Sequence, residues 1–353
     1  MGRSARPSWR SCDPARTLEA PLLTRLALLY ELAARLEKRA DQTAVMAPVM
    51  QVDDIPARVT TPYGFHLCGP SHNAVMLAAM RLSGSHPYEP LVSLLALYMT
   101  RAGGTFIDIG ANIGYFSLLV ARNTGGPLRV HALEPLPENF RWVRENVAAN
   151  GLGDDIMAYA VAAGAAAGEA SMSSYGTGAS LIEGWDGGKG DEQPKVLVPV
   201  RRLDDLFAPD ELPGPITIKM DVEGYESEAV KGAPRLLASE SVRCVLMELG
   251  YGLNDDVYNT TARDTLARMA DHGYLCYGHH SPVNGRVGVE DVRLWSPDDP
   301  EIQNAERWPT NWAFVRPDPT WDALVSGLRT LYGMFCSTGH RTVAEIRRFL
   351  DGL

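Results

Sequence analysis

The sequence predicts an α/β fold in which a parallel sheet carries helices on both faces. Residues 105–109 have the apolar pattern of a strand, and after a glycine turn residues 115–122 have apolar positions at helical spacing. Residues 129–134 form a second predicted strand, which ends in a carboxylate. Strand and helix patterns then alternate as far as residue 279. This alternation is typical of a sheet assembled from strand–helix–strand units.

The turn between the first strand and its helix, Gly110-Ala-Asn-Ile-Gly114, predicts a ligand site. Glycine has no Cβ, so a ligand can approach the backbone closely. Glu134 follows about 20 residues later, the usual offset of an acid that accepts hydrogen bonds from ribose hydroxyls. The glycines that would bind the diphosphate of a dinucleotide are missing from the turn. A nucleoside cofactor without a diphosphate fits better, and we predict S-adenosylmethionine (SAM).

Composition and charge narrow the function classes. The chain has 353 residues and a net charge of −10, which argues against a sequence-independent nucleic-acid binder. It lacks a run of about 18 apolar residues, so we expect no membrane span. The five cysteines are scattered and contain no Cys-x-x-Cys pair, as expected for reduced thiols in the cytoplasm. Residues 1–17 carry four arginines and no apolar signal core, which fits a disordered leader or, alternatively, an organelle transit peptide.

Four elements are predicted before the first strand. Residues 18–39 form an amphipathic helix, which either packs on the catalytic body as a lid or pairs with a second copy of the chain as a homodimer. Residues 52–67 form a hairpin around Pro62-Tyr-Gly64. Residues 73–82 form a short helix, and residues 91–100 form an apolar helix that leads into the first strand.

Downstream of Glu134 the alternation continues. Strands are predicted at residues 156–161, 196–200, 216–221, 242–248, 274–279 and 311–315. Helices are predicted at residues 138–150, 202–206, 222–232 and 261–272, with one or two closing helices in 321–353. The intervening residues 164–194 are rich in Gly, Ala and Ser, which predicts turns and exposed hairpins.

Six sequence blocks in this order are typical of one enzyme family. They are Tyr88-Glu-Pro90; Phe106-Ile-Asp-Ile-Gly-Ala-Asn-Ile-Gly114; Ala132-Leu-Glu-Pro135 with Asn139; Arg202-Leu-Asp-Asp205; Ile218-Lys-Met-Asp-Val-Glu-Gly224 with Glu226 and Lys231-Gly-Ala233; and Leu246-Met-Glu248. Over residues 84–316 the chain thus resembles the FkbM family of SAM-dependent methyltransferases. The resemblance implies a class I methyltransferase fold, a Rossmann-like sheet of seven strands with the last antiparallel. It also implies O-methylation of a hydroxyl on a sugar, a polyketide or another small metabolite, as in natural-product biosynthesis.

We predict that the chain has four parts, of which the resemblance covers only the region from residue 84 to residue 316. Residues 1–50 are a leader and the N-terminal amphipathic helix, and residues 51–102 are a hairpin and helical segment that covers cofactor or substrate. Residues 103–317 are the SAM-binding methyltransferase domain. Residues 318–353 are C-terminal helices.

The resemblance also assigns the cofactor site. It places Asp108 and Gly110 at the methionine end of SAM, with Asn112 and Gly114 in the same turn, and makes Glu134 the ribose acceptor. The alternative for the turn is a tight strand-to-helix connection with a structural aspartate.

Two further cofactor residues each have an equally plain alternative. Val161 follows the third strand and lies near the adenine, or else it is ordinary core. Glu89 reaches the cofactor, or else it caps a helix. We retain both as cofactor-binding candidates.

The catalytic candidates lie where the fourth strand ends. Lys219 and Asp221 are alternate residues of one strand and therefore project to the same face, about 7 Å apart. A lysine in an apolar central strand is costly unless it is paired. Asp221 and Glu223 lie at the carboxyl end of that strand, where open α/β sheets bind ligands, and Glu248 ends the next strand. We predict that Asp221 contacts the sulfonium or takes the acceptor proton; the alternative is an ion-paired loop.

Other readings stay open at this stage. His279 or His280 is a candidate general base at the end of the sixth strand, whereas His131 is expected in the core. Carboxylates at one cleft also suit Mg²⁺, but the resemblance implies no metal and we predict none. Methyl transfer to nitrogen or to a carboxylate, a nicotinamide-dependent oxidoreductase and a non-enzymatic scaffold are the alternative functions.

Overall fold

A computed structural model describes most of the predicted catalytic domain. The described residues are 57–61, 63–69, 88–173, 180–181, 195–249, 256–279, 293–303 and 311–318. The helices predicted at 18–39, 73–82 and 321–353, and His280, lie outside them.

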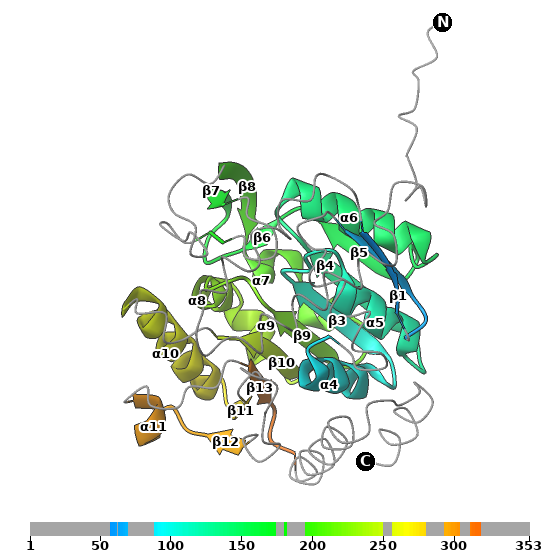
Figure 1. The fold of residues 1–353 in the computed structure, drawn as a ribbon. Helices are drawn as coiled ribbons and strands as arrows, with labels where there is room; N and C mark the ends of the chain where they lie inside the picture. The colour runs from blue at the N-terminus through cyan, green and yellow to red at the C-terminus, as the bar shows by residue number, and fades with distance from the viewer. Residues whose placement is uncertain are drawn as a thin grey trace, which may run out of the picture.

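The centre of the fold is a sheet of eight strands in the order β12-β11-β13-β10-β9-β3-β4-β5 (Figure 1). These strands are β3 (Gly104–Ile109), β4 (Leu128–Leu133), β5 (Ile156–Tyr159), β9 (Ile216–Met220), β10 (Val242–Glu248), β11 (Leu275–His279), β12 (Arg293–Trp295) and β13 (Asn311–Val315). Strands β5, β4, β3, β9 and β10 are parallel, and β13 lies antiparallel between β10 and β11. The predicted class I methyltransferase sheet is therefore confirmed. The short edge strand β12 makes eight strands instead of the predicted seven.

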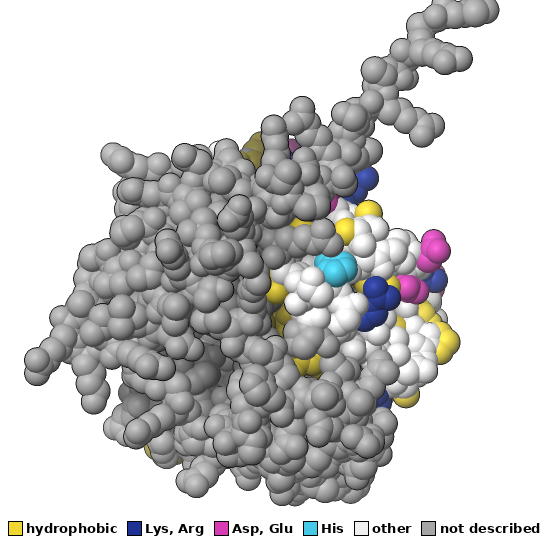
Figure 2. Space-filling model, turned by 45° about the vertical axis from the view of Figure 1, so that its right-hand side comes forward, with side chains coloured by type: hydrophobic (Ala, Val, Ile, Leu, Met, Phe, Trp, Pro, Cys, Tyr) yellow, Lys and Arg dark blue, Asp and Glu magenta, His cyan; other side chains and the backbone are white. Residues whose placement is uncertain are grey.

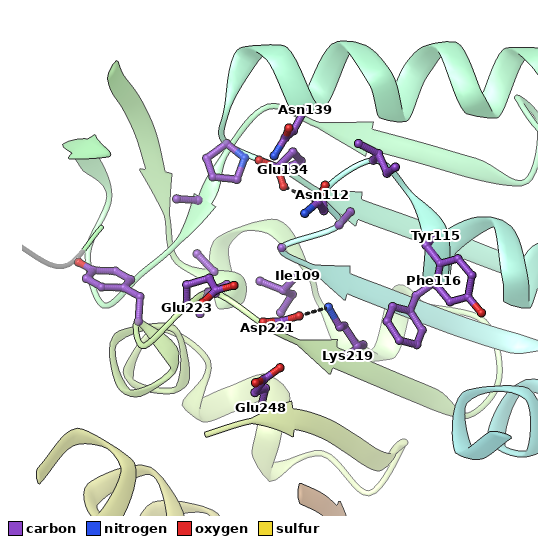
Figure 3. Close-up of a pocket in the computed structure, with 18 of the residues that line it drawn as sticks. Ile109, Asn112, Tyr115, Phe116, Glu134, Asn139, Lys219, Asp221, Glu223 and Glu248 are labelled. Atoms are coloured by element: carbon purple, nitrogen blue, oxygen red, sulfur yellow. Dashed lines mark hydrogen bonds and ion pairs between the residues drawn. The ribbon is translucent and has the colours of Figure 1, made fainter. Parts of the chain in front are cut away.

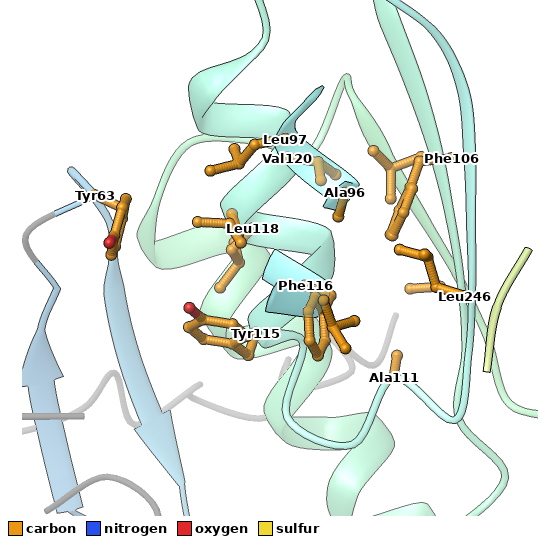
Figure 4. Packing of buried hydrophobic residues seen from close by; sticks show 14 of the residues in the cluster. Tyr63, Ala96, Leu97, Phe106, Ala111, Tyr115, Phe116, Leu118, Val120 and Leu246 are labelled. Carbon is orange, nitrogen blue, oxygen red and sulfur yellow. The ribbon is translucent and has the colours of Figure 1, made fainter. Parts of the chain in front are cut away.

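Helices cover both faces of this sheet, as the alternation predicts. One face carries α4 (Pro90–Thr100), α5 (Tyr115–Asn123) and α6 (Pro137–Ala149), and the other carries α8 (Glu226–Lys231), α9 (Pro234–Ala238) and α10 (Asp256–Asp271) (Figure 1). Shorter helices are α7 (Leu203–Leu206), the 3₁₀ turn η4 (Pro209–Glu211) and α11 (Pro300–Gln303). Phe106 of β3 packs toward α4 and α5 (Figure 4), whereas Ile107 and Ile109 pack on the opposite side.

This alternation fixes which polar residues share a face. Asp108 comes two residues after Phe106 in β3, so its side chain points to the same face of the sheet, the one that carries α4 and α5. In β9, Ile218 and Met220 pack on the opposite side, which leaves Lys219 on the same face as Asp108. The strand register pairs Asp108 directly with Lys219. Two ionisable residues of the central strands are therefore neighbours in the interior.

The predicted N-terminal hairpin is confirmed as β1 (Ala57–Thr60) paired antiparallel with β2 (His66–Gly69). Two amide side chains of α6 attach it to the domain. Asn146 accepts a hydrogen bond from Cys68 N and donates to Cys68 O and Ile113 O, each at 2.8 Å. Asn150 accepts from His66 N and donates to His66 O, both at 2.7 Å. The amides thus supply the hydrogen bonds that a neighbouring strand would otherwise supply.

A second, small sheet lies beside the main one. It consists of β6 (Ala162–Ala163), β7 (Gly168–Ser173) and β8 (Lys195–Arg201). Strands β7 and β8 form the antiparallel pair expected from the predicted hairpins, and residues 174–179 and 182–194 lie outside the described part. The predicted strand 156–161 is shorter than expected: β5 ends at Tyr159, and β6 of the small sheet begins at Ala162.

The character of the helices and the charges on the surface bear on the predicted partners. In the described part of the chain, no helix has both the length and the apolar character needed to cross a membrane. Figure 2 shows one face of the molecule, on which described side chains of both charges lie among uncharged atoms.

Candidate functional site

A pocket of about 280 Å³ lies at the carboxyl ends of β3, β4, β9 and β10 (Figure 3). This is the edge at which parallel α/β sheets bind ligands. One end of the pocket contains the glycine turn, Glu134 and Asn139, and the other contains Lys219 and a group of carboxylates. Of the predicted site residues, the pocket lining includes Glu89, Gly110, Asn112, Glu134, Val161, Asp221, Glu223 and Glu248. Asp108 and Gly114 are not among the described lining residues.

The two glycines of the turn are required for different structural reasons. Gly110 has φ of 79°, and a Cβ there would lie 1.8 Å from the carbonyl oxygen of Asp221. The end of β3 therefore touches the backbone of the loop that follows β9, which only glycine permits. Gly114 has φ of 91° and occupies the N-cap position of α5. The turn is thus shaped first by backbone contacts within the protein.

Glu134 fastens this turn to β4. Its Oε2 accepts a hydrogen bond from Asn112 N at 2.8 Å, and its Oε1 accepts one from Leu136 N at 2.9 Å. Burial raises the pKa of Glu134 to about 7, although these N–H groups act in the opposite direction. The Asn139 side chain donates a third hydrogen bond to this carboxylate, so of its about four acceptor positions about one remains for a ribose hydroxyl. The amides of Gly110 and Ala111 donate to Leu133 O and are not available to a ligand.

Asp108 lies beneath the turn. It is fully buried, and its Oδ2 accepts hydrogen bonds from Ser117 N at 3.1 Å and Ser117 Oγ at 2.6 Å. The carboxylate therefore caps the first turn of α5. Its Oδ1 has no hydrogen-bond partner within the described structure. Burial raises the pKa of Asp108, and the neighbouring Lys219 opposes that rise. Contact with the methionine end of SAM remains a prediction for this residue.

Lys219 and Asp221 form the ion pair that the strand alternation predicts. Lys219 Nζ lies 2.9 Å from Asp221 Oδ2 and 4.9 Å from the ring centroid of Phe116 (Figure 3). Only 5% of Lys219 is exposed. Burial lowers the pKa of Lys219, but the carboxylates of Asp221, Asp108 and Glu89 outweigh burial and raise it. The ammonium is therefore charged and balances a carboxylate-rich interior.

Three more carboxylates surround this pair. Burial, together with the Asp221 charge, raises the pKa of Glu89 to about 7 and that of Glu223 to about 8. Glu248 is accessible at the mouth of the pocket, and the same two causes raise its pKa as well. Carboxylate oxygens of Glu89, Asp221 and Glu248 lie within 4.8 Å of one another, close enough to hold a divalent cation. Because the ammonium of Lys219 already neutralises the carboxylate of Asp221 through its Oδ2, we retain the prediction of a site without metal.

Backbone strain also concentrates at the pocket. Among the described residues, the non-glycine residues with positive φ are Glu89 at 44°, Asn112 at 54° and Glu223 at 52°. All three line the pocket. Such conformations cost energy and persist where the surrounding structure enforces them, which is common at ligand sites.

The remaining candidates, Val161, His279 and His131, lie in different parts of the fold. Val161 is half-buried and lines the pocket with Met172 and Leu181, an apolar wall suited to a flat base. His279 lies in β11 and pairs through its backbone with Asn311 of β13. Strand β13 separates β11 from the pocket strands, and the role of His279 remains a prediction. His131 is buried and close to Tyr159, as expected for a core residue.

Several lining residues were not predicted. They are Tyr88, Tyr115, Phe116, Asn139, Met172, Leu181 and Tyr225. Tyr88 and Asn139 belong to blocks of the resemblance, and Tyr115 follows directly after the glycine turn. Met172 and Leu181 carry no sequence signal. Met172 lies in β7 of the small sheet, and Leu181 follows Ser180, whose carbonyl accepts a hydrogen bond from Ser173 N at the end of β7.

The comparisons with known proteins agree with this geometry. Residues 108–276 match the family model of the methyltransferase FkbM domain, which confirms the resemblance. No curated protein matches the chain significantly.

Solved structures show similarity at low identity. The methyltransferase FkbM of Methylobacillus flagellatus KT is 18% identical with a TM-score of 0.36, covering 82% of this chain and 59% of its own. The O-methyltransferase of Bacillus cereus in complex with SAH is 13% identical with a TM-score of 0.38, covering 83% of this chain and 100% of its own. A SAM-dependent O-methyltransferase of Thermotoga maritima is 13% identical with a TM-score of 0.32, covering 66% of each chain. At these values, we base function on the family match and on the chain's own site.

The raised carboxylate pKa values predict how stability depends on pH. Glu223 has a pKa of about 8 when folded, against about 4.3 when unfolded. Between these values the folded state binds more protons, so the free energy of unfolding falls as pH rises through this window. Thermal melts of the ligand-free protein should show this fall, and Glu223→Gln should make it shallower. Glu228→Gln, in the surface pair with Lys231, is the matched control. An identical slope in Glu223→Gln and wild type would contradict the assignment.

Proposed function

We propose, from the premise that residues 108–276 form a methyltransferase FkbM domain, that this chain transfers the methyl group of SAM to a hydroxyl oxygen of a small metabolite. The observation that carries the proposal is the two-ended pocket. Glu134, the proposed ribose acceptor, and the glycine turn lie at one end, and the ion pair of the buried Lys219 with the partly exposed Asp221 lies at the other.

The residues present fit SAM as the cofactor. Glu134 retains an acceptor position for a ribose hydroxyl, and the lining residues Val161, Met172 and Leu181 suit an adenine ring. The carboxylates at the opposite end suit the positively charged methionine end. The unpaired Oδ1 of Asp108 adds buried acceptor capacity beneath the turn. When bound, SAM supplies an activated methyl group on a positively charged sulfur.

Asp221 is the residue best placed to handle the acceptor. Its side chain is partly exposed to the pocket, and Lys219 holds one of its oxygens at 2.9 Å. The other oxygen is available to accept the proton of an acceptor hydroxyl, or to orient that hydroxyl in line with the methyl group. Glu223 lies two residues further along the same loop, and protonated near neutral pH it would serve as a hydrogen-bond donor.

The nature of the acceptor and the cellular setting complete the proposal. A neutral hydroxylated compound, as in natural-product biosynthesis, suits the carboxylate-rich end better than an anion would. We further propose a cytoplasmic protein whose amphipathic segment 18–39 either pairs with a second copy or covers the site. The nicotinamide-dependent alternative gains no support, because the matched family is one of methyltransferases. Screening SAM with a labelled methyl group against hydroxyl, amine and carboxylate compounds tests the acceptor type.

The first prediction concerns the cofactor. Glu134→Ala should weaken SAM binding by about 1.5–3 kcal/mol, the size of lost hydrogen bonds to a charged group. Isothermal titration calorimetry measures this, and Glu138→Ala, an exposed glutamate four residues further on, is the control. Unchanged affinity in a folded Glu134→Ala protein would remove Glu134 from the site.

The second prediction concerns Asp221. Asp221→Asn keeps the shape of the side chain but removes its charge, so the turnover of an acceptor found by the screen should fall by roughly 10²-fold or more. If Asp221 serves only to neutralise Lys219, the same change leaves a buried charge unpaired and costs about 3–5 kcal/mol of stability. Melting curves and single-turnover rates distinguish the two. The catalytic role would be contradicted by a destabilised variant whose folded fraction turns over substrate at the normal rate.

The third prediction concerns metal. Because Lys219 occupies an oxygen of Asp221, we expect methyl transfer to survive EDTA. We also expect Mg²⁺ and Mn²⁺ to leave the melting temperature unchanged. Activity that disappears with chelator and returns with Mg²⁺ would instead make Glu89, Asp221 and Glu248 metal ligands.

A further inference from the structure

Glu89 enters the pocket from an element that precedes the sheet. It occupies the N-cap position of α4 with φ of 44°, directly before Pro90, and its backbone oxygen accepts a hydrogen bond from Ser93 N at 2.9 Å. Its side chain makes no capping hydrogen bond to the helix. The carboxylate instead lines the pocket beside Asp221 and Glu248. A residue type that is unusual at this position thus presents its charge to the ligand site.

The hydroxyl of Tyr115 holds this segment in place. Tyr115 Oη accepts a hydrogen bond from Tyr88 N at 3.0 Å, and Ser93 Oγ donates to Tyr88 O. Ser93 Oγ also lies 3.4 Å from the Tyr115 oxygen. Both backbone polar groups of Tyr88 are therefore bound by side chains, immediately before the residue with the strained backbone.

The ring of Tyr115 is itself immobilised by its surroundings. It makes edge-to-face contacts with Phe65, Tyr88 and Phe116, at centroid distances of 5.8, 5.5 and 5.1 Å. The residue is 5% exposed, and burial raises its pKa, so the hydroxyl stays neutral. Tyr115 is also the first residue of α5, directly after the glycine turn. The Tyr115 side chain, labelled in Figures 3 and 4, therefore connects the turn with the Tyr88–Glu89 segment.

We propose that Tyr115 is a positioning residue, which holds the Glu89 carboxylate against the cationic part of the cofactor. The inference rests on the proposed function, namely that the pocket binds SAM. Around Glu89 the described lining contains the carboxylates of Asp221, Glu223 and Glu248 and one ammonium, that of Lys219. A cation placed here favours the charged form of the Glu89 carboxylate, so the sulfonium and ammonium groups of SAM suit this end of the pocket.

The test uses binding, so no acceptor is needed. Isothermal titration calorimetry compares SAM, S-adenosylhomocysteine and 5′-methylthioadenosine, a nucleoside that carries neither cation. Glu89→Gln should weaken SAM binding about 10-fold or more and leave 5′-methylthioadenosine within about twofold, because only the charged contact is lost. Tyr115→Phe should show the same pattern with a smaller factor. The double variant should bind SAM no more weakly than Glu89→Gln, because both changes act through one contact.

Matched variants separate positioning from general destabilisation. Tyr274→Phe removes a buried hydroxyl that donates to Leu237 O at 3.0 Å, and it should leave the affinity for all three ligands unchanged. If Tyr115→Phe does not fold, Ser93→Ala removes the other bond to the same segment and should give the same ligand pattern. Weakening of S-adenosylhomocysteine as well as SAM identifies the ammonium as the partner of Glu89, and weakening of SAM alone identifies the sulfonium.

Other results would overturn the proposal. They are an equal loss for 5′-methylthioadenosine in Tyr115→Phe, additive losses in the double variant, or unchanged SAM binding in Glu89→Gln. A wild-type protein that binds none of the three ligands would instead overturn the proposed function, and this inference with it.

Discussion

The buried ammonium of Lys219 is the interaction on which the functional end of this protein depends. It lies in the central strand β9, beside Asp108 of β3 and in contact with Asp221 at the strand end. Without this positive charge, Asp108 and Asp221 would be buried anions without compensation, and such groups are strongly destabilising. The ring of Phe116 lies against the ammonium and connects α5 to the same centre. One cation thus couples two core strands, a helix and the carboxylate-rich end of the pocket.

A second set of contacts organises the opposite end, and it consists almost entirely of backbone groups. The glycine turn approaches the Asp221 carbonyl too closely for any side chain at position 110. Glu134 then closes the turn onto β4 by accepting two backbone N–H groups. A ligand therefore meets a turn whose own amides are largely satisfied. The turn contributes shape and the Glu134 acceptors, while charge comes from the Lys219 end.

The sequence was informative where function leaves a local pattern. The apolar strands, the turn from Gly110 to Gly114 and the carboxylates Glu134 and Asp221 are readable because chain spacing alone determines their relation. The alternation in β9 even predicted that Lys219 and Asp221 would project together. Strand β12 was not predicted, because three residues are too few to show the alternating hydrophobic pattern of a strand. The role of Tyr115 toward Tyr88 was also missed, because it depends on a contact between residues 27 apart in the chain. Met172 lines the pocket from β7 of the small sheet, whose pairing has no local signature.

The attachment of the β1–β2 hairpin has a consequence for how the family can diverge. Asn146 and Asn150 bind only the main chain of residues 68 and 66, so these hydrogen bonds are indifferent to which side chains stand there. Asn146 also binds the carbonyl of Ile113 in the glycine turn. Substitutions along the outward side of the hairpin can therefore accumulate without loosening its attachment to the turn. This outer surface can therefore take on side chains that suit a new molecular neighbour while the hairpin stays fixed to the turn.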